Sequence, residues 1–327
     1  MYKIAVVGPI PKDTIITHKG EVIEKYGCVT HPVIALSKLL QNEGTVIPIA
    51  HIHKGDKEAI EKVFEPYQNI NLTGIYNHHN KGTKIELKFI DQNNRLEKQL
   101  AKMHPITSAD VEPFLDADAF VFVPITDFEV SLDTLKYLKQ NSETMIIFDA
   151  HGPTTFVNEE GARLRRYWKD RDEWFPYIDV LKMNLEESQC CWIDRPYETF
   201  DEASYDENDL DHLDDFANYV LEKGVSVLYI TLDSRGALIY SKDGDTVDKQ
   251  MVASVPVDHV VDTTGCGDSF AGGLAYGFTV YGDIVKAAQY ANVLGAMRTQ
   301  GKTFDVFKNK DETDQIIRET YSSSTGL

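Results

Sequence analysis

Several short runs of apolar residues along this chain are continuous rather than alternating. Lys3–Gly8, Ala119–Val123 and Met145–Phe148 are examples, and Val225–Thr231 is a later one. A strand exposed on one face alternates polar and apolar residues, whereas a parallel strand covered on both faces does not. Segments with helical spacing, such as His31–Leu40, lie between these runs. The pattern predicts one α/β domain with a mostly parallel central sheet.

One segment between the predicted strands has a different pattern. Thr83–Ile90 alternates, Asp91–Asn94 has the composition of a turn, and Arg95–Gln99 continues after it. A hairpin with one apolar face is expected, and such a face must cover something. We therefore expect a small β lid with elements around residues 13–30 and 72–105. An apolar lid face left exposed would offer a contact to a second subunit, so a homodimer formed through the lid is a further hypothesis.

Two polar segments complete the secondary-structure prediction. Residues 152–176 are expected to form a polar helical stretch that carries Arg163, Arg165, Arg166, Trp168 and Trp174. Residues 194–215 are strongly acidic, which is typical of a solvated loop that leads into a helix. The histidines of the first third (His51, His53, His78 and His79) lack the partners and spacing of a metal site.

The net charge of the chain is −19, which argues against nucleic acid or an anionic membrane as its partner. No apolar run approaches the length of a membrane span, and the N-terminal residues do not resemble a secretory signal. The four cysteines show no C-x-x-C spacing: Cys28, Cys190, Cys191 and Cys266. We therefore expect a cytoplasmic protein whose partner is a small molecule.

The string Asp262-Thr-Thr-Gly-Cys-Gly-Asp268 carries the clearest chemistry in the chain. Its glycines, Gly265 and Gly267, allow a sharp turn that presents successive N–H groups to an anion. The apolar stretch from Phe270 predicts a helix whose N-terminus lies just behind those groups and also favours negative charge. Asp268 adds a carboxylate at the end of the turn. Together these features predict a site that stabilises a phosphate while a base removes a proton from the attacking group.

Three further segments of the chain accompany this string, and their order along the chain matters. The chain has no G-x-x-x-x-G-K-[ST], and Gly8-Pro-Ile-Pro11 replaces any dinucleotide-binding G-x-G-x-x-G. Instead, Tyr177–Glu187 ends in N-x-x-E, Thr231-Leu-Asp-Ser-Arg-Gly236 is a glycine-ended loop, and Ala291-Asn292 lies in the last predicted helices. With the D-T-x-G-x-G-D string, this order resembles the PfkB (ribokinase-like) family of small-molecule kinases over nearly the whole chain. The resemblance implies a single ribokinase-like domain, residues 1–327, with a three-layer fold and a β-hairpin lid.

The resemblance also implies a reaction, the ATP-dependent phosphorylation of a hydroxyl group on a small polyol, most simply a sugar. Asp268 would be the general base, and the N–H groups of Gly265, Cys266 and Gly267 would hold the developing charge. The residues implied in ATP binding are Asn184, Thr231, Gly236 and Asn292. Glu187, with Asn184, would organise Mg²⁺ through water, although a carboxylate in the first turn of a helix also has a purely structural explanation. Asp262 and the carbonyl of Thr264 fall where relatives bind a monovalent cation such as K⁺.

The acceptor side departs from the family pattern. Asp13 fits the aspartate that holds acceptor hydroxyls, although a turn aspartate is the structural alternative. In Tyr26-Gly27-Cys-Val-Thr-His31, a tyrosine replaces one glycine and His31 replaces the substrate-binding asparagine. His151, in Phe148-Asp-Ala-His151, likewise stands in the place of an asparagine. We therefore expect Asp13, Gly27, His31 and His151 to contact an acceptor that differs from the commonest sugars.

Two alternatives remain open from the sequence. Tyr26 removes space or adds a stacking face, which leaves a nucleoside (adenosine-like) kinase as the alternative within the class. Asp233 replaces a loop glycine near the expected ATP phosphates, where a carboxylate would be repulsive. Together with the altered 26–33 segment, it motivates a second alternative, a ligand-binding relative that has lost catalysis.

Overall fold

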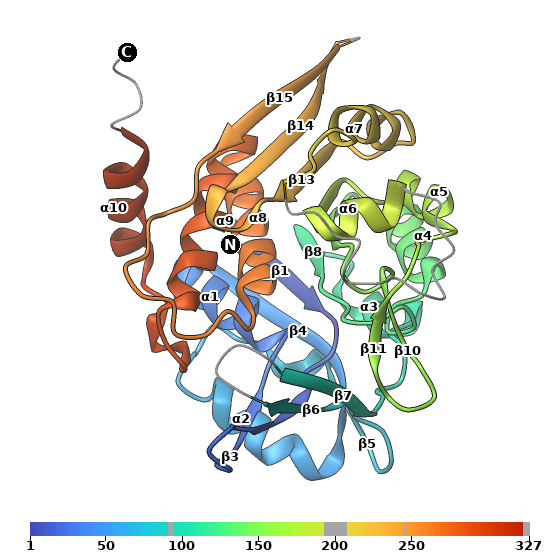
Figure 1. Ribbon diagram of the computed structural model, residues 1–327, viewed down its shortest axis with the longest axis vertical. Coiled ribbons are helices and arrows are strands. Elements are labelled where there is room, and N and C mark those ends of the chain that lie inside the picture. The colour runs from blue at the N-terminus through green and yellow to red at the C-terminus, as the bar shows by residue number, and fades with distance from the viewer. Residues whose placement is uncertain (91–94, 193–207, 245, 323–327) are drawn as a thin grey trace.

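A nine-stranded sheet forms the centre of the computed structural model, which describes residues 1–90, 95–192, 208–244 and 246–322 (Figure 1). Seven strands pair in parallel, from β13 to β5, and two antiparallel strands extend the sheet at one edge. In spatial order the strands are β15 (Thr246–Val252), β14 (Ala237–Asp243), β13 (Val227–Thr231), β12 (Val180–Asn184), β9 (Met145–Asp149), β8 (Ala119–Phe122), β1 (Tyr2–Val7), β4 (Gly44–His53) and β5 (Ile75–His78).

Helices cover both faces of this sheet, so the predicted α/β fold is confirmed. On β1, Ile4 and Val6 belong to one hydrophobic cluster, whereas Ala5 and Val7 belong to the other. Successive side chains of a strand point to opposite faces, so a strand that is buried on both sides must be apolar throughout. The helices that pack in the first cluster are α1 (Thr30–Leu40), α2 (Lys57–Phe64), α8 (Cys266–Tyr281), α9 (Ile284–Thr299) and α10 (Lys310–Tyr321). The helices that pack in the second cluster are α3 (Ser108–Val111), α4 (Leu132–Asn141), α5 (Arg171–Trp174), α6 (Leu185–Trp192) and α7 (Leu213–Glu222). None of the described helices is long and apolar enough to cross a membrane.

A second, four-stranded sheet lies over one end of the central sheet (Figure 1). The predicted hairpin is present as β6 (Lys84–Phe89) and β7 (Arg95–Ala101), and its predicted turn, 91–94, lies outside the described residues. Its other half is a hairpin of β2 (Lys12–Ile16) and β3 (Val22–Tyr26), and β2 pairs in parallel with β6. The lid is therefore a sheet made from two hairpins that are far apart in sequence. β5 lies within the range expected for the lid but belongs to the central sheet.

The helical prediction for residues 152–176 was wrong. This segment contains an antiparallel pair of strands, β10 (Thr155–Val157) and β11 (Arg163–Arg165), and its only α-helix is the short α5. The turn contains Gly161 at φ 84°, and its carbonyl accepts a hydrogen bond from the N–H of Gln99 on β7 at 2.8 Å. Contact with the lid thus favours a hairpin where local composition favoured a helix. Of the acidic segment, 193–207 lies outside the described residues, and the remainder leads into α7 as predicted.

Candidate active site

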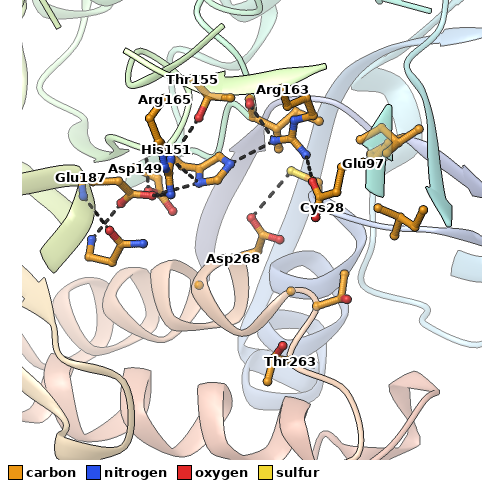
Figure 2. A pocket seen from close by; sticks show the side chains of 18 of the residues that line it. Cys28, Glu97, Asp149, His151, Thr155, Arg163, Arg165, Glu187, Thr263 and Asp268 are labelled. Atoms are coloured by element: carbon orange, nitrogen blue, oxygen red, sulfur yellow. Dashed lines mark hydrogen bonds and ion pairs between the residues drawn. The ribbon is translucent and has the colours of Figure 1, made fainter. Parts of the chain in front are cut away.

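A cavity of about 740 Å³ lies between the lid, the carboxyl ends of β9 and β12 and the N-terminus of α8 (Figure 2). In an open α/β sheet, this end of the strands is where ligands bind. Its polar lining consists of Asp13, Glu97, Asp149, His151, Thr155, Arg163, Arg165, Lys182, Asn184, Glu186, Glu187, Thr263, Thr264, Gly265, Gly267 and Asp268. Ile85, Leu87 and Leu96 of the lid strands contribute to its apolar part. The lid thus contributes apolar side chains together with two carboxylates, Asp13 and Glu97, and the other charged groups come from the body of the protein.

The segment Asp262–Gly267, which we call the glycine loop or anion loop, leads into α8 directly beside this cavity. Gly265 is in the left-handed conformation, φ 84° and ψ 7°, and α8 begins at the next residue. Gly265 and Gly267 line the cavity, whereas the N–H of Cys266 donates to the carbonyl of Thr263 at 3.2 Å. The N-terminus of α8, with its favourable dipole, faces the same space. Two of the three residues expected to bind the anion thus line the cavity, and the third stabilises the turn.

Asp268 lies in the first turn of α8 and lines the cavity. Burial raises the pKa of its carboxyl group, and the nearby charge of Lys182 acts in the opposite direction. The Sγ atom of Cys28 lies 3.8 Å from its Oδ1 atom. A carboxylate that is partly desolvated and faces an anion-binding loop is placed to accept a proton from a bound hydroxyl group.

Lys182, a buried lysine that is not among the predicted site residues, lies against the glycine loop. The Nζ atom of Lys182 donates to Asp149 Oδ2 at 2.8 Å, and a Cβ atom at Gly267 would come within 3.0 Å of it. Burial alone would lower the pKa of Lys182, but the charges of Asp149 and Glu187 raise it, so the ammonium group stays protonated. Its signal in the sequence was a lysine within the apolar strand that precedes Asn184.

His151 lies among the charged side chains that line the cavity (Figure 2). Its Nδ1 atom lies 2.9 Å from Glu187 Oε1, and its Nε2 atom lies 3.0 Å from Arg163 Nη2. Burial lowers the pKa of His151 to about 4, although the hydrogen bond to Glu187 opposes this shift. The neutral ring therefore donates from Nδ1 to Glu187 and accepts at Nε2 from Arg163. His151 thus lines the cavity, and its contact with an acceptor stays a prediction.

Arg163 and Arg165, two residues apart on β11, extend to the same side of the strand and line the cavity. Arg165 pairs with Glu186 at 2.8 Å and donates to Thr155 Oγ1 at 3.0 Å. Arg163 instead reaches the lid, where its Nη1 atom lies 3.3 Å from Glu97 Oε2. The i, i+2 spacing of the two arginines is typical of a strand with both side chains on one face, but the prediction of a helix for this segment passed over that pattern.

Asn184 and Glu187 form a reciprocal cap at the start of α6. The N–H of Asn184 donates to Glu187 Oε2 at 2.8 Å, and the N–H of Glu187 donates to Asn184 Oδ1 at 2.7 Å. Burial would raise the pKa of Glu187, but His151, Lys182 and Arg165 lower it, so the group is a carboxylate. The structural explanation for Glu187 thus holds, and its place in the cavity wall leaves a role toward Mg²⁺ open.

Asp13, on the lid strand β2, lines the cavity, and burial raises the pKa of its carboxyl group to about 7. Gly27 lies behind it, because a Cβ atom there would come within 2.7 Å of Asp13 Oδ2. Tyr26 is not part of the cavity lining, and its hydroxyl donates to Asp56 Oδ1 at 3.2 Å. The stacking face expected from Tyr26 is therefore directed elsewhere.

His31 lies beneath the glycine loop rather than among the residues that line the cavity. Its Nδ1 atom accepts a hydrogen bond from Arg298 Nε at 3.0 Å, and a Cβ atom at Gly265 would come within 2.4 Å of its ring. Thr264 lines the cavity, and its N–H donates to Asp262 Oδ1 at 2.9 Å. Of the substitutions noted in the sequence, His31 thus contacts the loop and His151 faces the cavity.

The other residues expected to bind ATP lie beside the cavity. Thr231 pairs with Asn184 across β12 and β13, and Gly236 directly precedes β14, so they continue the same edge of the sheet. The amide of Asn292 donates to the carbonyls of Val252 at 3.2 Å and Ala253 at 3.0 Å. Asp233 lies in a short 3₁₀ turn at φ 50°. Gly236 and Asn292 both lie against the backbone of Val252 and Ala253.

A sequence model described as "pfkB family carbohydrate kinase" matches residues 67–304 of the chain. Among curated proteins, the 2-dehydro-3-deoxygluconokinase of Bacillus subtilis is 38% identical over 84 residues, which are 26% of this chain and 25% of that protein. The deoxyribokinase of Salmonella typhi is 31% identical over 94 residues, or 28% of each chain. These alignments thus span little more than a quarter of the curated relatives.

Solved structures with the same fold align over almost the whole chain. The ribokinase of Thermotoga maritima has a TM-score of 0.73 at 17% identity and aligns over 97% of this chain and 100% of its own. A ribokinase of Arabidopsis thaliana, solved with ribose and ATP, has a TM-score of 0.72 at 15% identity, with coverages of 97% and 99%. A pyrophosphate-dependent kinase of the ribokinase family has the same TM-score at 17% identity, with coverages of 96% and 99%.

Proposed function

Because the chain belongs to the pfkB family of carbohydrate kinases, we propose that it transfers the terminal phosphoryl group of ATP to a hydroxyl group of a small sugar. One observation carries this proposal: the carboxylate of Asp268 and the glycines of the anion loop, Gly265 and Gly267, line the same cavity. That arrangement places a base and an anion-binding loop around one point, which is what phosphoryl transfer to a hydroxyl group requires.

In the proposed reaction, Asp268 accepts the proton of the acceptor hydroxyl as its oxygen attacks the γ-phosphorus. The new O–P bond forms while the bond from the γ-phosphorus to the bridging oxygen breaks, and ADP leaves. Negative charge on the transferred group meets the loop at Gly265 and Gly267, and the ammonium of Lys182 lies against that loop. Fixed charges of this kind, held in a partly desolvated site, lower the barrier without reorganisation.

The donor would lie along Asn184, Thr231, Gly236 and Asn292. Its phosphates would then reach the glycine loop past Arg165 and Lys182, both of which line the cavity. Glu186 and Glu187 supply the oxygen ligands that suit Mg²⁺, so Mg²⁺ bound to the donor phosphates fits this wall, held through water by Glu187 beside Asn184. When bound, Mg²⁺ neutralises part of the phosphate charge.

The acceptor would lie between Asp13, His151 and the apolar face of the lid. Asp13 accepts hydrogen bonds from hydroxyl groups once it is ionised, and Ile85 and Leu87 exclude water from the reacting groups. The curated relatives are named for 2-dehydro-3-deoxygluconate and deoxyribose, which supports a sugar acceptor. A nucleoside is less favoured, because the side chain of Tyr26 is directed to Asp56 and offers no stacking face to the cavity.

The test is a screen of sugars, sugar acids and nucleosides with ATP and Mg²⁺, in which both ADP and the phosphorylated product are measured. Replacement of the base, Asp268→Asn, should reduce kcat by about 10²–10⁴-fold, whereas Asp258→Asn, at an exposed aspartate of the preceding loop, should not. An Asp268→Asn protein that folds and turns over at the wild-type rate would contradict the proposed mechanism. Binding of ATP without product from any acceptor would instead support the catalytically inactive relative.

Inorganic pyrophosphate is a second candidate for the donor. Arg165 and Lys182 line the cavity, whereas Thr231, Gly236 and Asn292 are not among its lining residues. Arg165 and Lys182 would bind the phosphate groups of such a donor, and one solved relative of the same fold depends on pyrophosphate. Turnover with pyrophosphate in place of ATP, measured as phosphorylated acceptor, separates the two donors.

A further inference from the structure

We propose that this chain supplies its own cations to the anion loop: Lys25 of the lid and Arg298 of α9 occupy Asp262 in place of the monovalent cation expected there. The inference rests on the proposed kinase function. At the same loop, two side chains of the protein take the place of an expected ligand.

Both oxygen atoms of the Asp262 carboxylate already have partners within the protein. Its Oδ2 atom lies 3.0 Å from Lys25 Nζ and 3.0 Å from Arg298 Nη2, and its Oδ1 atom accepts the N–H of Thr264 at 2.9 Å. A K⁺ ion bound to this carboxylate would lie beside an ammonium and a guanidinium group, and like charges at contact distance repel. The residues present therefore do not fit a monovalent cation at Asp262.

The arginine is fixed in the core rather than attached loosely to the surface. Its side chain is 1% exposed, its Nε atom donates to His31 Nδ1 at 3.0 Å, and its Nη1 atom donates to the carbonyl of Gly301. Burial and the charge of Arg298 lower the pKa of His31, so the ring is neutral and able to accept this bond. Because His31 packs directly under Gly265, the chain from Arg298 through His31 also sets the position of the loop.

The lysine connects the loop to the acceptor side of the lid. Lys25 lies on β3 directly opposite Asp13 on β2, so one cross-strand pair reaches both the loop and the acceptor cavity. Closure of the lid thus brings the ammonium group of Lys25 to Asp262 together with Asp13 to the acceptor. Arg298 and His31 are positioning residues for the loop, and Lys25 is a positioning residue that depends on the lid.

The decisive measurement compares chloride salts of K⁺ and of tetramethylammonium, an ion too large for such a site, at equal ionic strength. A cation that binds only the folded protein raises its melting temperature, so the wild type should melt at the same temperature and turn over at the same rate in both salts. A melting temperature raised specifically by K⁺, or turnover raised about tenfold or more by K⁺, would overturn the proposal.

The variant Lys25→Met removes one of the two cations from a side chain that is 19% exposed, so the protein is expected to fold. It should lower kcat and make both melting temperature and turnover respond to K⁺, because K⁺ can then take the place of the missing ammonium group beside Asp262, while Arg298 remains. The matched control is Lys12→Met on the neighbouring strand, which removes an ion pair with Glu24 of 3.0 Å and does not reach Asp262. A Lys25→Met protein that matches Lys12→Met in every respect would contradict the role of Lys25.

The two proposals fail in different ways. If no acceptor is phosphorylated in either salt, the proposed function fails, and the melting comparison of wild type and Lys25→Met still decides the cation question. If turnover occurs but depends on K⁺ in the wild type, the kinase proposal stands and the cation proposal fails. Because Arg298 is buried, Arg298→Lys is the suitable second variant, and it should lower kcat more than it raises the KM for the acceptor.

Discussion

Lys182 and Asp149 form a buried ion pair of 2.8 Å at the carboxyl ends of two adjacent parallel strands. The carboxylate keeps the ammonium group charged, and the ammonium group in turn lies against Gly267 of the anion loop. Removal of one member of such a pair leaves the other as an unpaired charge in the protein interior. The pair therefore links the stability of the strand ends to the charge that the loop can offer a phosphate.

The first prediction separates these two effects of Lys182. Lys182→Met should cost about 3–5 kcal/mol of stability, because it leaves the buried carboxylate of Asp149 without a counter-ion. It should also lower kcat by about 10²-fold through loss of charge at the loop. The double variant Lys182→Met/Asp149→Asn should regain much of the stability but little of the kcat. Recovery of both, measured by denaturant unfolding and product formation, would mean that Lys182 acts only in packing.

A second prediction concerns the backbone of the loop. Gly265→Ala should nearly abolish turnover, because the residue is at φ 84° and the new Cβ atom would overlap the ring of His31 at 2.4 Å. Gly20→Ala is a matched control, since Gly20 has φ 81° and no atom within 4 Å of the added Cβ atom. The control should lose only about 1 kcal/mol and should keep wild-type kcat. Comparable losses of kcat in the two variants would show that backbone strain alone explains the effect.

A third prediction concerns the contact between lid and body. The Arg163–Glu97 ion pair joins β11 to the lid strand β7 across 3.3 Å, beside the backbone hydrogen bond from Gln99 to Gly161. Arg163→Met should raise the KM for the acceptor by about tenfold with a smaller change in kcat, because the closed lid is less favoured. In a double-mutant cycle, Glu97→Gln should add little to it. Additive effects of the two changes would show that the pair does not act as a unit.

The fourth prediction is a pH dependence of stability at Asp13. Burial raises its pKa in the folded state to about 7 from an ordinary value of 3.8. The folded state then binds a proton that the unfolded state has released, so this contribution to stability is complete below pH 3.8 and is lost as the pH rises toward 7. Relative to the wild type, Asp13→Asn should therefore gain stability between these values. A difference between the two proteins that is constant from pH 4 to 8 would contradict the raised pKa.

His151 should produce the opposite trend in the acid range. Its folded-state pKa is lowered to about 4 from 6.5, so the stability it contributes is present above pH 6.5 and decreases as the pH falls toward 4. In His151→Gln, which retains a neutral side chain with a donor and an acceptor, this decrease should be absent. The prediction is wrong if the free energies of unfolding of wild type and variant change with pH in the same way across that range.

Much of the fold could be predicted from short apolar runs, because a strand buried on both faces has no polar face to alternate. The same approach failed for residues 152–176, where arginines and tryptophans favoured a helix on local grounds. The hairpin there depends on contact of Gly161 with Gln99 of the lid, some sixty residues earlier in the chain. Contacts at that separation leave no periodic pattern in either segment.

The candidate site shows the same division. The string that ends in Asp268 indicated a phosphate loop from residue types alone, because glycines and a carboxylate at that spacing have a local chemical meaning. The sequence could not indicate which of two histidines reaches the cavity, since His31 and His151 each replace an asparagine. Tertiary packing places His31 of α1 under Gly265, outside the cavity lining, and His151 in the cavity wall beside Glu187.

By itself, the sequence determined the parallel α/β fold, the family and the anion loop, because each depends on residues that are adjacent or regularly spaced in the chain. Tertiary structure alone decided that Lys182 lies against Gly267, that Arg163 and Arg165 line the cavity, and that Lys25 and Arg298 occupy Asp262. These contacts join residues from different strands and helices. Their energies depend on distance and burial, which arise only when the layers pack together.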